Sequence, residues 1–276
     1  MAELTIRVEG GRVVVSDDSG ATTEVVDAHL RARLLNWVRE ATRLPRSFEM
    51  PSAAALAGLA EARLMRPQTT GIGAHPETPP PSGHNIPLAS LARTAPLDET
   101  FQRRRSERNV GPLSLADLAS VLVTVGRVRG WDEAPDGYQR TYRPVPSGGG
   151  RHPIELWVAA GEVEGLPSGL WKFESTSAEL AEHGPVPESV WSGAADTLEG
   201  RQSLAALVLL VAQFERTLSR YPAGAALVWR DAGVVAMALH LQATAAGLRS
   251  TILATAGLLP LGPGMRCDVC SVLLGK

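Results

Sequence analysis

This sequence of 276 residues has only two cysteines and no apolar run long enough to cross a bilayer. Two cysteines, Cys267 and Cys270, are too few for a disulfide framework, so we expect a reducing compartment, the cytoplasm. A membrane-spanning helix needs about 20 consecutive apolar residues, and none is present, so we expect no membrane partner. The first residues lack a basic segment followed by an apolar core, so no signal peptide is predicted.

The chain also lacks a strong excess of charge of either sign. Its 27 Lys and Arg residues nearly balance 29 Asp and Glu residues, and the formal net charge is -2. A general nucleic-acid binder would carry a clear positive excess, so we expect no nucleic-acid partner. The hydrophobic fraction of 44% is ordinary for a soluble globular chain with a sizeable core.

Metal ligands are sparse as well. Cys267 and Cys270 form a single Cys-x-x-Cys pair, whereas a structural zinc site needs four ligands, usually with a second pair elsewhere. The six histidines show no ligand-like spacing. We therefore predict no metal site and interpret both cysteines as ordinary residues of a strand or turn.

The most informative segment that is present is a run of three glycines at 148–150. It follows a Pro-Ser corner and precedes an apolar run at 154–160 that is typical of a buried strand. Because glycine has no Cβ atom, a flat ligand can approach this backbone closely. The segment lacks the Lys-Ser/Thr of a Walker A loop and the spacing of a Rossmann fingerprint, so nucleoside triphosphates and NAD do not fit. We predict a ligand-facing glycine loop that His152 helps to hold.

A basic cluster, Arg-Arg-Arg-Ser-Glu-Arg, occupies residues 103–108. It is either a solvated helix face or a phosphate clamp, in which guanidinium groups and a serine hydroxyl bind phosphate oxygens. Combined with the glycine loop, it would supply an anionic anchor and a flat cradle. Those are the two environments that a flavin mononucleotide needs.

Composition divides the chain into three parts. Residues 1–66 are predicted to form a module with a hairpin at 4–16, turning at Gly10-Gly11, and two helices at 27–41 and 52–65. Residues 67–95 are rich in proline and glycine and are interpreted as a linker or arm. The first module could bind a leader peptide or a partner enzyme, cover a substrate, or act as a scaffold.

Residues 96–276 form the larger predicted domain. Its helical patterns begin near Thr100 and after a capping Ser114, and a polar loop is expected at 127–141. A further helix at 231–246 is expected in the core or at a dimer interface, with Asp231 as its cap and Gly247 as its stop. The strands are expected at 154–160, 169–173, 204–213 and 269–274.

The basic cluster and the glycine loop together resemble the nitroreductase superfamily. The two motifs read Arg-Arg-Ser-Glu-Arg at 104–108 and Pro-Ser-Gly-Gly-Gly-Arg-His-Pro-Ile-Glu at 146–155. More narrowly, residues 96–276 resemble the SagB-type dehydrogenases, the McbC-like azoline oxidases of thiazole/oxazole-modified peptide pathways. The segments 169–173, 220–221 and 232–248 also fit this resemblance.

The resemblance implies an α+β fold with a central mixed or antiparallel sheet flanked by helices. It also implies FMN as the cofactor, bound at the interface of a dimer that we expect to be a homodimer. The basic cluster would meet the phosphate and ribityl chain, and the glycine loop would pass along the isoalloxazine ring. The residues implied in FMN binding are Arg104, Ser106, Arg108, Pro146, Ser147, Gly148, Gly149 and Gly150.

The activity that the resemblance implies is the oxidation of azoline rings to azoles in a ribosomally made, post-translationally modified peptide. Its partners would be a leader-bearing peptide and cyclodehydratase-type enzymes. The implied catalytic pair is Arg220 and Tyr221, but the similar enzymes typically have Lys-Tyr there. Arginine stays protonated and cannot be a general base, so Tyr221 would act alone or with another base.

Two alternatives remain open from the sequence. One is an NAD(P)H-dependent flavin oxidoreductase of a small molecule. The other is a catalytically silent partner subunit that keeps the fold and binds peptide. Arg220 in place of lysine fits the second alternative, as does the absence of a late basic pair, since only Lys276 stands near the end.

Overall fold

The computed structural model describes residues 5–9, 12–16, 22–24, 84–89, 95–134, 137–198, 205–221, 224–259, 261 and 266–276. The chain divides into two compact units, residues 1–61 and 62–276. We predicted the first module to end at residue 66, a few residues after this division.

The first unit contains a three-stranded antiparallel sheet made of β1 (Thr5–Glu9), β2 (Arg12–Ser16) and β3 (Thr22–Glu24). Glu9 pairs with Arg12, so two residues connect the first two strands and the predicted hairpin is confirmed. The third strand was not predicted. The helices expected at 27–41 and 52–65 lie outside the described residues.

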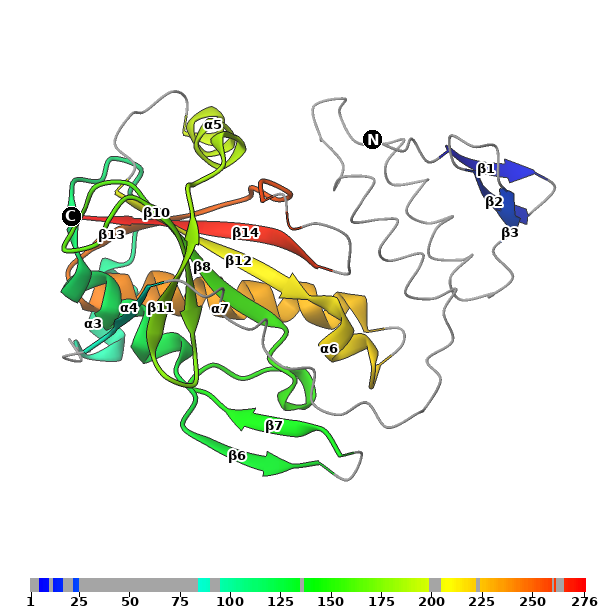
Figure 1. Ribbon diagram of the computed structural model, residues 1–276, viewed down its shortest axis with the longest axis horizontal. Helices are drawn as coiled ribbons and strands as arrows, with labels where there is room; N and C mark the ends of the chain where they lie inside the picture. Colours follow the sequence, from blue (N-terminus) through cyan, green and yellow to red (C-terminus); the bar gives the residue numbers. More distant parts are fainter. Residues whose placement is uncertain are drawn as a thin grey trace. The chain divides into compact units, whose positions relative to one another are not determined.

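The second unit is built on a seven-stranded sheet in which every neighbouring pair is antiparallel (Figure 1). The α+β class with an antiparallel sheet is therefore confirmed. Along the sheet the strands are β13 (Arg249–Leu253), β14 (Arg266–Gly275), β12 (Ala206–Gln213), β8 (Ile154–Ala160), β10 (Gly169–Glu174), β11 (Glu179–Gly184) and β4 (Asn85–Pro87).

The centre of the sheet follows from two apolar segments of the sequence. β8 is buried along its whole length and β12 along all but its last residue, as expected for strands covered on both faces. β4 forms the edge, so the predicted linker contributes a strand at 85–87.

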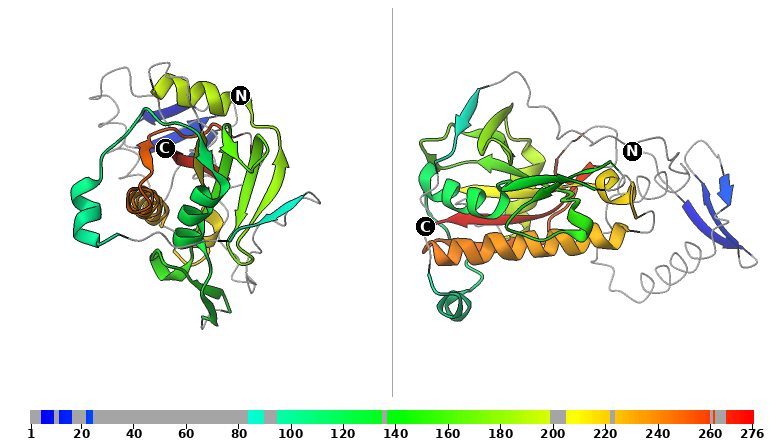
Figure 2. Two further views of the ribbon diagram at one scale, coloured as in Figure 1. Left: turned by 90° about the vertical axis from the view of Figure 1, so that its left-hand side faces the viewer. Right: turned by 90° about the horizontal axis from the view of Figure 1, so that it is seen from below.

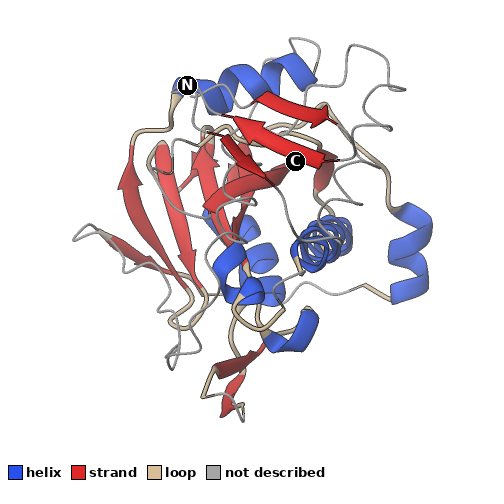
Figure 3. Ribbon diagram, turned by 90° about the vertical axis from the view of Figure 1, so that its right-hand side faces the viewer, coloured by secondary structure: helices blue, strands red, loops and turns tan. Residues whose placement is uncertain are grey.

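Helices cover both faces of this sheet (Figures 2 and 3). α4 (Leu115–Gly126) and α7 (Ala225–Ala245) lie on one face, with the short α6 (Phe214–Leu218) before α7. α5 (Glu188–Thr197) packs on the other face, where alternate residues of β12 such as Leu207 and Leu209 meet Val190. α3 (Leu97–Arg103) ends at the first residue of the basic cluster. Among the described residues, no helix has the length and apolarity that a membrane span requires.

Ser114 caps α4 as predicted, since its hydroxyl accepts the Asp117 amide proton at 3.1 Å. Ser114 also belongs to β5 (Leu113–Ser114), which pairs in parallel with β9 (Val163–Glu164). Gly247 ends α7 with a φ of 74°, also as predicted.

Two other expectations were wrong. The polar loop expected at 127–141 contains a hairpin of β6 (Gly130–Glu133) and β7 (Gln139–Tyr142). Its strands are too short, and too rich in polar residues, for their alternation to stand out. α7 begins at Ala225 after Gly224, so Asp231 is inside the helix and is not its cap. The residues at 225–230 include good helix formers that extend the helix toward its start.

Candidate functional site

The three glycines form one tight turn, η1 (Gly148–Gly150), directly before β8. Gly149 and Gly150 have φ angles of 64° and 66°, a region that glycine enters without steric cost. The Gly150 amide donates to the Ser147 carbonyl at 3.1 Å. The glycine loop therefore has one defined conformation.

Tyr221 packs directly against this loop. A Cβ atom placed on Gly149 would lie 2.6 Å from the Tyr221 hydroxyl oxygen, closer than real side chains allow. Glycine at this position is thus what permits the phenol to lie on the turn. The structure brings the predicted catalytic Tyr221 to the predicted cradle, whereas Arg220 is exposed.

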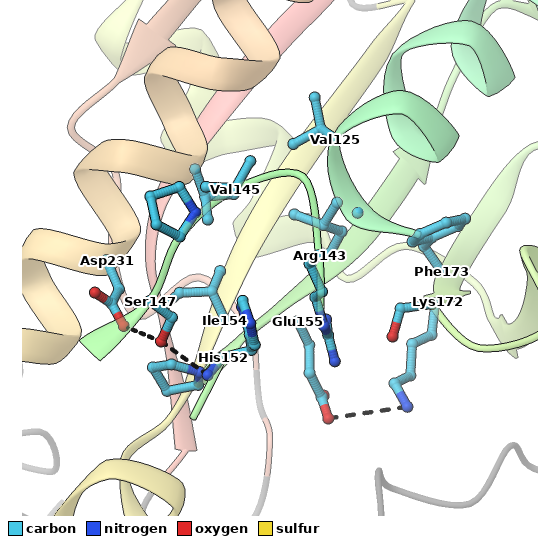
Figure 4. A pocket seen from close by; sticks show the side chains of 16 residues that line it. Val125, Arg143, Val145, Ser147, His152, Ile154, Glu155, Lys172, Phe173 and Asp231 are labelled. Carbon is cyan, nitrogen blue, oxygen red and sulfur yellow. Dashed lines mark hydrogen bonds and ion pairs between the residues drawn. The ribbon is translucent and has the colours of Figure 1, made fainter. Parts of the chain in front are cut away.

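Asp231 of α7 holds the loop in place (Figure 4). Its buried carboxylate accepts the Ser147 hydroxyl proton at 2.6 Å and the Gly148 amide proton at 3.2 Å. The Ser147 hydroxyl oxygen in turn accepts the His152 amide proton at 2.8 Å. Asp231 therefore binds both the Ser147 side chain and the Gly148 backbone, a role that the sequence did not suggest.

His152 closes the loop on its other side. Its Nε2 lies 2.9 Å from the Thr141 carbonyl oxygen, and because a carbonyl only accepts, Nε2 must carry the proton. Burial, reinforced by the nearby Arg143 guanidinium, lowers the pKa of His152 to about 4. The neutral side chain thus connects β7 to the glycine loop, as expected for a residue that stabilises this loop.

A pH titration tests this neutral state. The unfolded chain protonates His152 near pH 6.5 and the folded protein only near pH 4, so stability present above pH 6.5 is lost as the pH falls between these values. The loss reaches up to about 3 kcal/mol. Asparagine tolerates the positive φ of 43° at this position and does not titrate. In urea unfolding, the wild type should therefore lose stability more steeply than His152→Asn between about pH 7 and pH 4.5; parallel curves would contradict this.

An open pocket lies beside the loop where two strands separate (Figure 4). β8 and β10 remain paired only as far as Trp157 and Lys172, and beyond that point β8 pairs with β12 alone. The residues lining the pocket include Arg143, Ser147, His152, Glu155, Lys172 and Asp231. The pocket therefore combines the anchored end of the loop with several charged side chains.

Four buried charged side chains lie where β8 and β10 separate. Glu155 accepts from Arg216 at 3.1 Å, and its Oε1 lies 3.9 Å from Lys172 Nζ. Lys172, which is 1% exposed, also lies 3.0 Å from Glu174. The cluster of Glu155, Lys172, Glu174 and Arg216 has no net charge, which lowers the cost of burying it. In the sequence, this cluster was signalled only by Glu155, a glutamate inside the otherwise apolar segment of β8.

The predicted phosphate clamp begins at the last residue of α3 and continues in irregular chain. Ser106 and Arg108 are exposed, and Arg104 is half-buried. Arg104 Nη1 lies 3.2 Å from Nε2 of His240, on α7. Asp231 and His240 are nine residues apart on that helix, about 13–14 Å at the usual rise per residue. The clamp and the glycine loop are thus attached to the same helix at two separate points.

The remaining candidates are structural. Both cysteines lie on β14, where burial raises the pKa of Cys267 to about 11 and that of Cys270 to about 12, which keeps them as thiols. Within the part of the chain that the structure describes, no group of three or more His, Cys, Asp or Glu side chains could hold a metal ion. Lys276 Nζ lies 2.9 Å from the Asp117 carboxylate, and so ties the end of β14 to α4.

Comparisons with known proteins agree with this architecture. No family model matches the sequence. A candidate nitroreductase of Methanocaldococcus jannaschii is 29% identical over 158 residues, which cover 55% of this chain and 75% of that protein. A crystal structure of a candidate nitroreductase from Ralstonia eutropha aligns with a TM-score of 0.51 and 21% identity, over 74% of this chain and 96% of the other.

A second candidate nitroreductase, from Anabaena variabilis, aligns with a TM-score of 0.51 and 18% identity. This alignment covers 80% of the present chain and 46% of the Anabaena chain, so the match spans about half of that protein. At these identities the structural similarities establish the fold alone. The chain thus has a nitroreductase-like α+β fold, as the two sequence motifs implied.

Proposed function

We propose that this protein is an FMN-dependent oxidoreductase of the SagB type that oxidises azoline rings to azoles in a modified peptide. The observation that carries the proposal is the contact between Tyr221 and Gly149, which places a proton-exchanging group on the glycine turn that we assign to the flavin ring. The nitroreductase-like fold and the motif resemblance support the same cofactor.

The residues present fit FMN at both of its ends. Ser106 and Arg108 are exposed donors next to Arg104, a donor set suited to a phosphate. At the other end, the glycine turn contacts Tyr221 at Gly149, and its Gly148 amide donates to Asp231. Pro146 and Ser147 lead into that turn. The binding residues are those that the sequence implied.

Oxidation of an azoline removes a hydride and a proton from the ring. FMN, when bound, supplies the hydride acceptor. The chain itself must receive the proton, and we assign this step to the Tyr221 oxygen, which accepts the ring proton in its deprotonated form and then releases it to solvent. Asp231 and His152 keep the turn beneath that hydroxyl in one conformation, which preserves the orientation of the phenol toward a bound ring.

Anaerobic mixing with a substrate tests the activity. FMN-loaded protein and a thiazoline- or oxazoline-bearing peptide should give bleaching of the flavin colour, together with loss of two hydrogens from the peptide by mass spectrometry. Bleaching by NAD(P)H in the absence of peptide, with no change in the azoline peptide, would contradict this substrate assignment.

A second candidate is the reduction of a small molecule with NAD(P)H as the electron donor. It is favoured by the sequence match to a protein described as a candidate nitroreductase. The same anaerobic experiment separates the two, because only the second predicts bleaching by NAD(P)H alone.

Exposed apolar side chains on α3 and α7 bear on the assembly of the protein. Leu97 and Phe101 of α3 are 67% and 52% exposed, and Val234 of α7 is 42% exposed. Large apolar side chains exposed on two packed helices suit a contact with a second copy, so we propose a homodimer.

We assign residues 1–66 to binding the leader of a substrate peptide or a cyclodehydratase-type partner, with residues 67–95 as the connection to the FMN-binding domain at 96–276.

A further inference from the structure

His240 is a buried polar residue that the proposed chemistry does not use. It is 2% exposed, and its two ring nitrogens contact different partners. Nε2 lies 3.2 Å from Nη1 of Arg104, and Nδ1 lies 2.6 Å from the hydroxyl oxygen of Ser250 on β13. The imidazole therefore links α7 to the basic cluster and to the edge of the sheet.

The chemistry of these partners fixes the tautomer. A guanidinium has donors and no acceptor, so His240 Nε2 must accept from Arg104. Nδ1 then carries the proton and donates it to Ser250. Burial, together with the neighbouring Arg104 charge, lowers the pKa of His240, which favours this neutral form.

Ser250 extends the same connection to the backbone of the basic cluster. Its carbonyl accepts the amide proton of Glu107 at 2.9 Å, while its hydroxyl meets His240. Glu107 stands between Ser106 and Arg108. One pair of buried residues thus holds both the Arg104 head group and the chain on which the other two donors are carried.

We propose that His240 is a positioning residue that fixes the Arg104 guanidinium for binding a phosphate monoester. This rests on the proposed function, in which the phosphate is that of FMN. A free arginine side chain loses much rotamer freedom when it binds a ligand. His240 imposes that order before the ligand arrives, so binding does not have to supply it. The residue acts through Arg104 and has no part in proton or hydride transfer.

FMN and riboflavin are the probes that test this role, because they differ only in the phosphate. In fluorescence titrations, His240→Leu should bind FMN about tenfold more weakly, the scale of one lost hydrogen bond to a charged group. Riboflavin affinity should not change. His240→Gln, which can accept from Arg104 and donate to Ser250, should retain FMN affinity within about threefold. Arg104→Ala gives the loss of FMN affinity that is expected when the guanidinium itself is absent.

A buried hydrogen bond between β14 and the segment after β13 provides the control. Thr255→Val removes the 2.6 Å contact with Ser271 and should leave both affinities unchanged. If His240→Leu does not fold, Ser250→Ala tests the same connection and should also weaken FMN selectively. Equal weakening of FMN and riboflavin by these variants, or no weakening at all, overturns the inference while the proposed function stands. A wild-type protein that binds neither flavin overturns the proposed function itself.

Discussion

Replacement of Tyr221 by phenylalanine is expected to lower azoline turnover by about 100-fold or more while FMN stays bound. The hydroxyl and the ring atoms next to it both meet the glycine turn, and the hydroxyl is the only group that phenylalanine lacks. The ring keeps its packing against Gly149, so the loop and the cofactor site are retained. Steady-state turnover of an azoline peptide, together with the flavin content of the variant, measures both effects.

Tyr142 provides the matched control for this substitution. It is 55% exposed on the β6–β7 hairpin, and its hydroxyl donates to Asp132 at 2.8 Å, outside the proposed site. Tyr142→Phe should therefore retain turnover. If Tyr221→Phe also retains it, another group exchanges the proton, and the Tyr221 assignment is wrong.

Replacement of Glu155 by glutamine is expected to cost about 3–5 kcal/mol of folding stability, because it leaves a net positive charge buried in the four-charge cluster. The carboxylate charge 3.1 Å from Arg216 would be replaced by a neutral amide, and Lys172 would lose the carboxylate charge 3.9 Å from its Nζ. For a unit of this size such a loss lowers the melting temperature by roughly 10 °C. Denaturant unfolding and thermal melting both measure it.

Two further variants make this prediction specific. Glu99→Gln breaks the exposed ion pair with Arg103 and should cost less than about 1 kcal/mol. The double variant Glu155→Gln with Lys172→Met restores charge balance between Glu174 and Arg216, so it should be more stable than Glu155→Gln alone. If Glu155→Gln is as stable as Glu99→Gln, the buried cluster does not depend on charge balance.

The sequence predicted those elements whose signal is local. The apolar runs of β8 and β12, the Ser114 cap and the Gly247 stop each depend on a few neighbouring residues, and all four are confirmed. β11, α5 and β13 were not predicted, because their patterns are short or mixed and the rest of the fold decides their conformation.

The site was predictable in its motifs but not in the contacts that support them. The glycine loop and the basic cluster are contiguous in sequence. Asp231 binds a loop more than eighty residues earlier, and His240 binds an arginine 136 residues earlier, so neither contact leaves a local pattern. For this reason Asp231 was misread as a helix cap, the role that Asp most often has at a helix start.

The absorption spectrum of the protein, as purified and after incubation with FMN and desalting, tests the central claim most directly. We predict visible flavin bands that persist through desalting, and a released chromophore with the mass of FMN. A protein that is colourless as purified and remains colourless after incubation with FMN would contradict the account, because both the glycine loop and the Arg104 clamp would then lack the ligand that we assign to them.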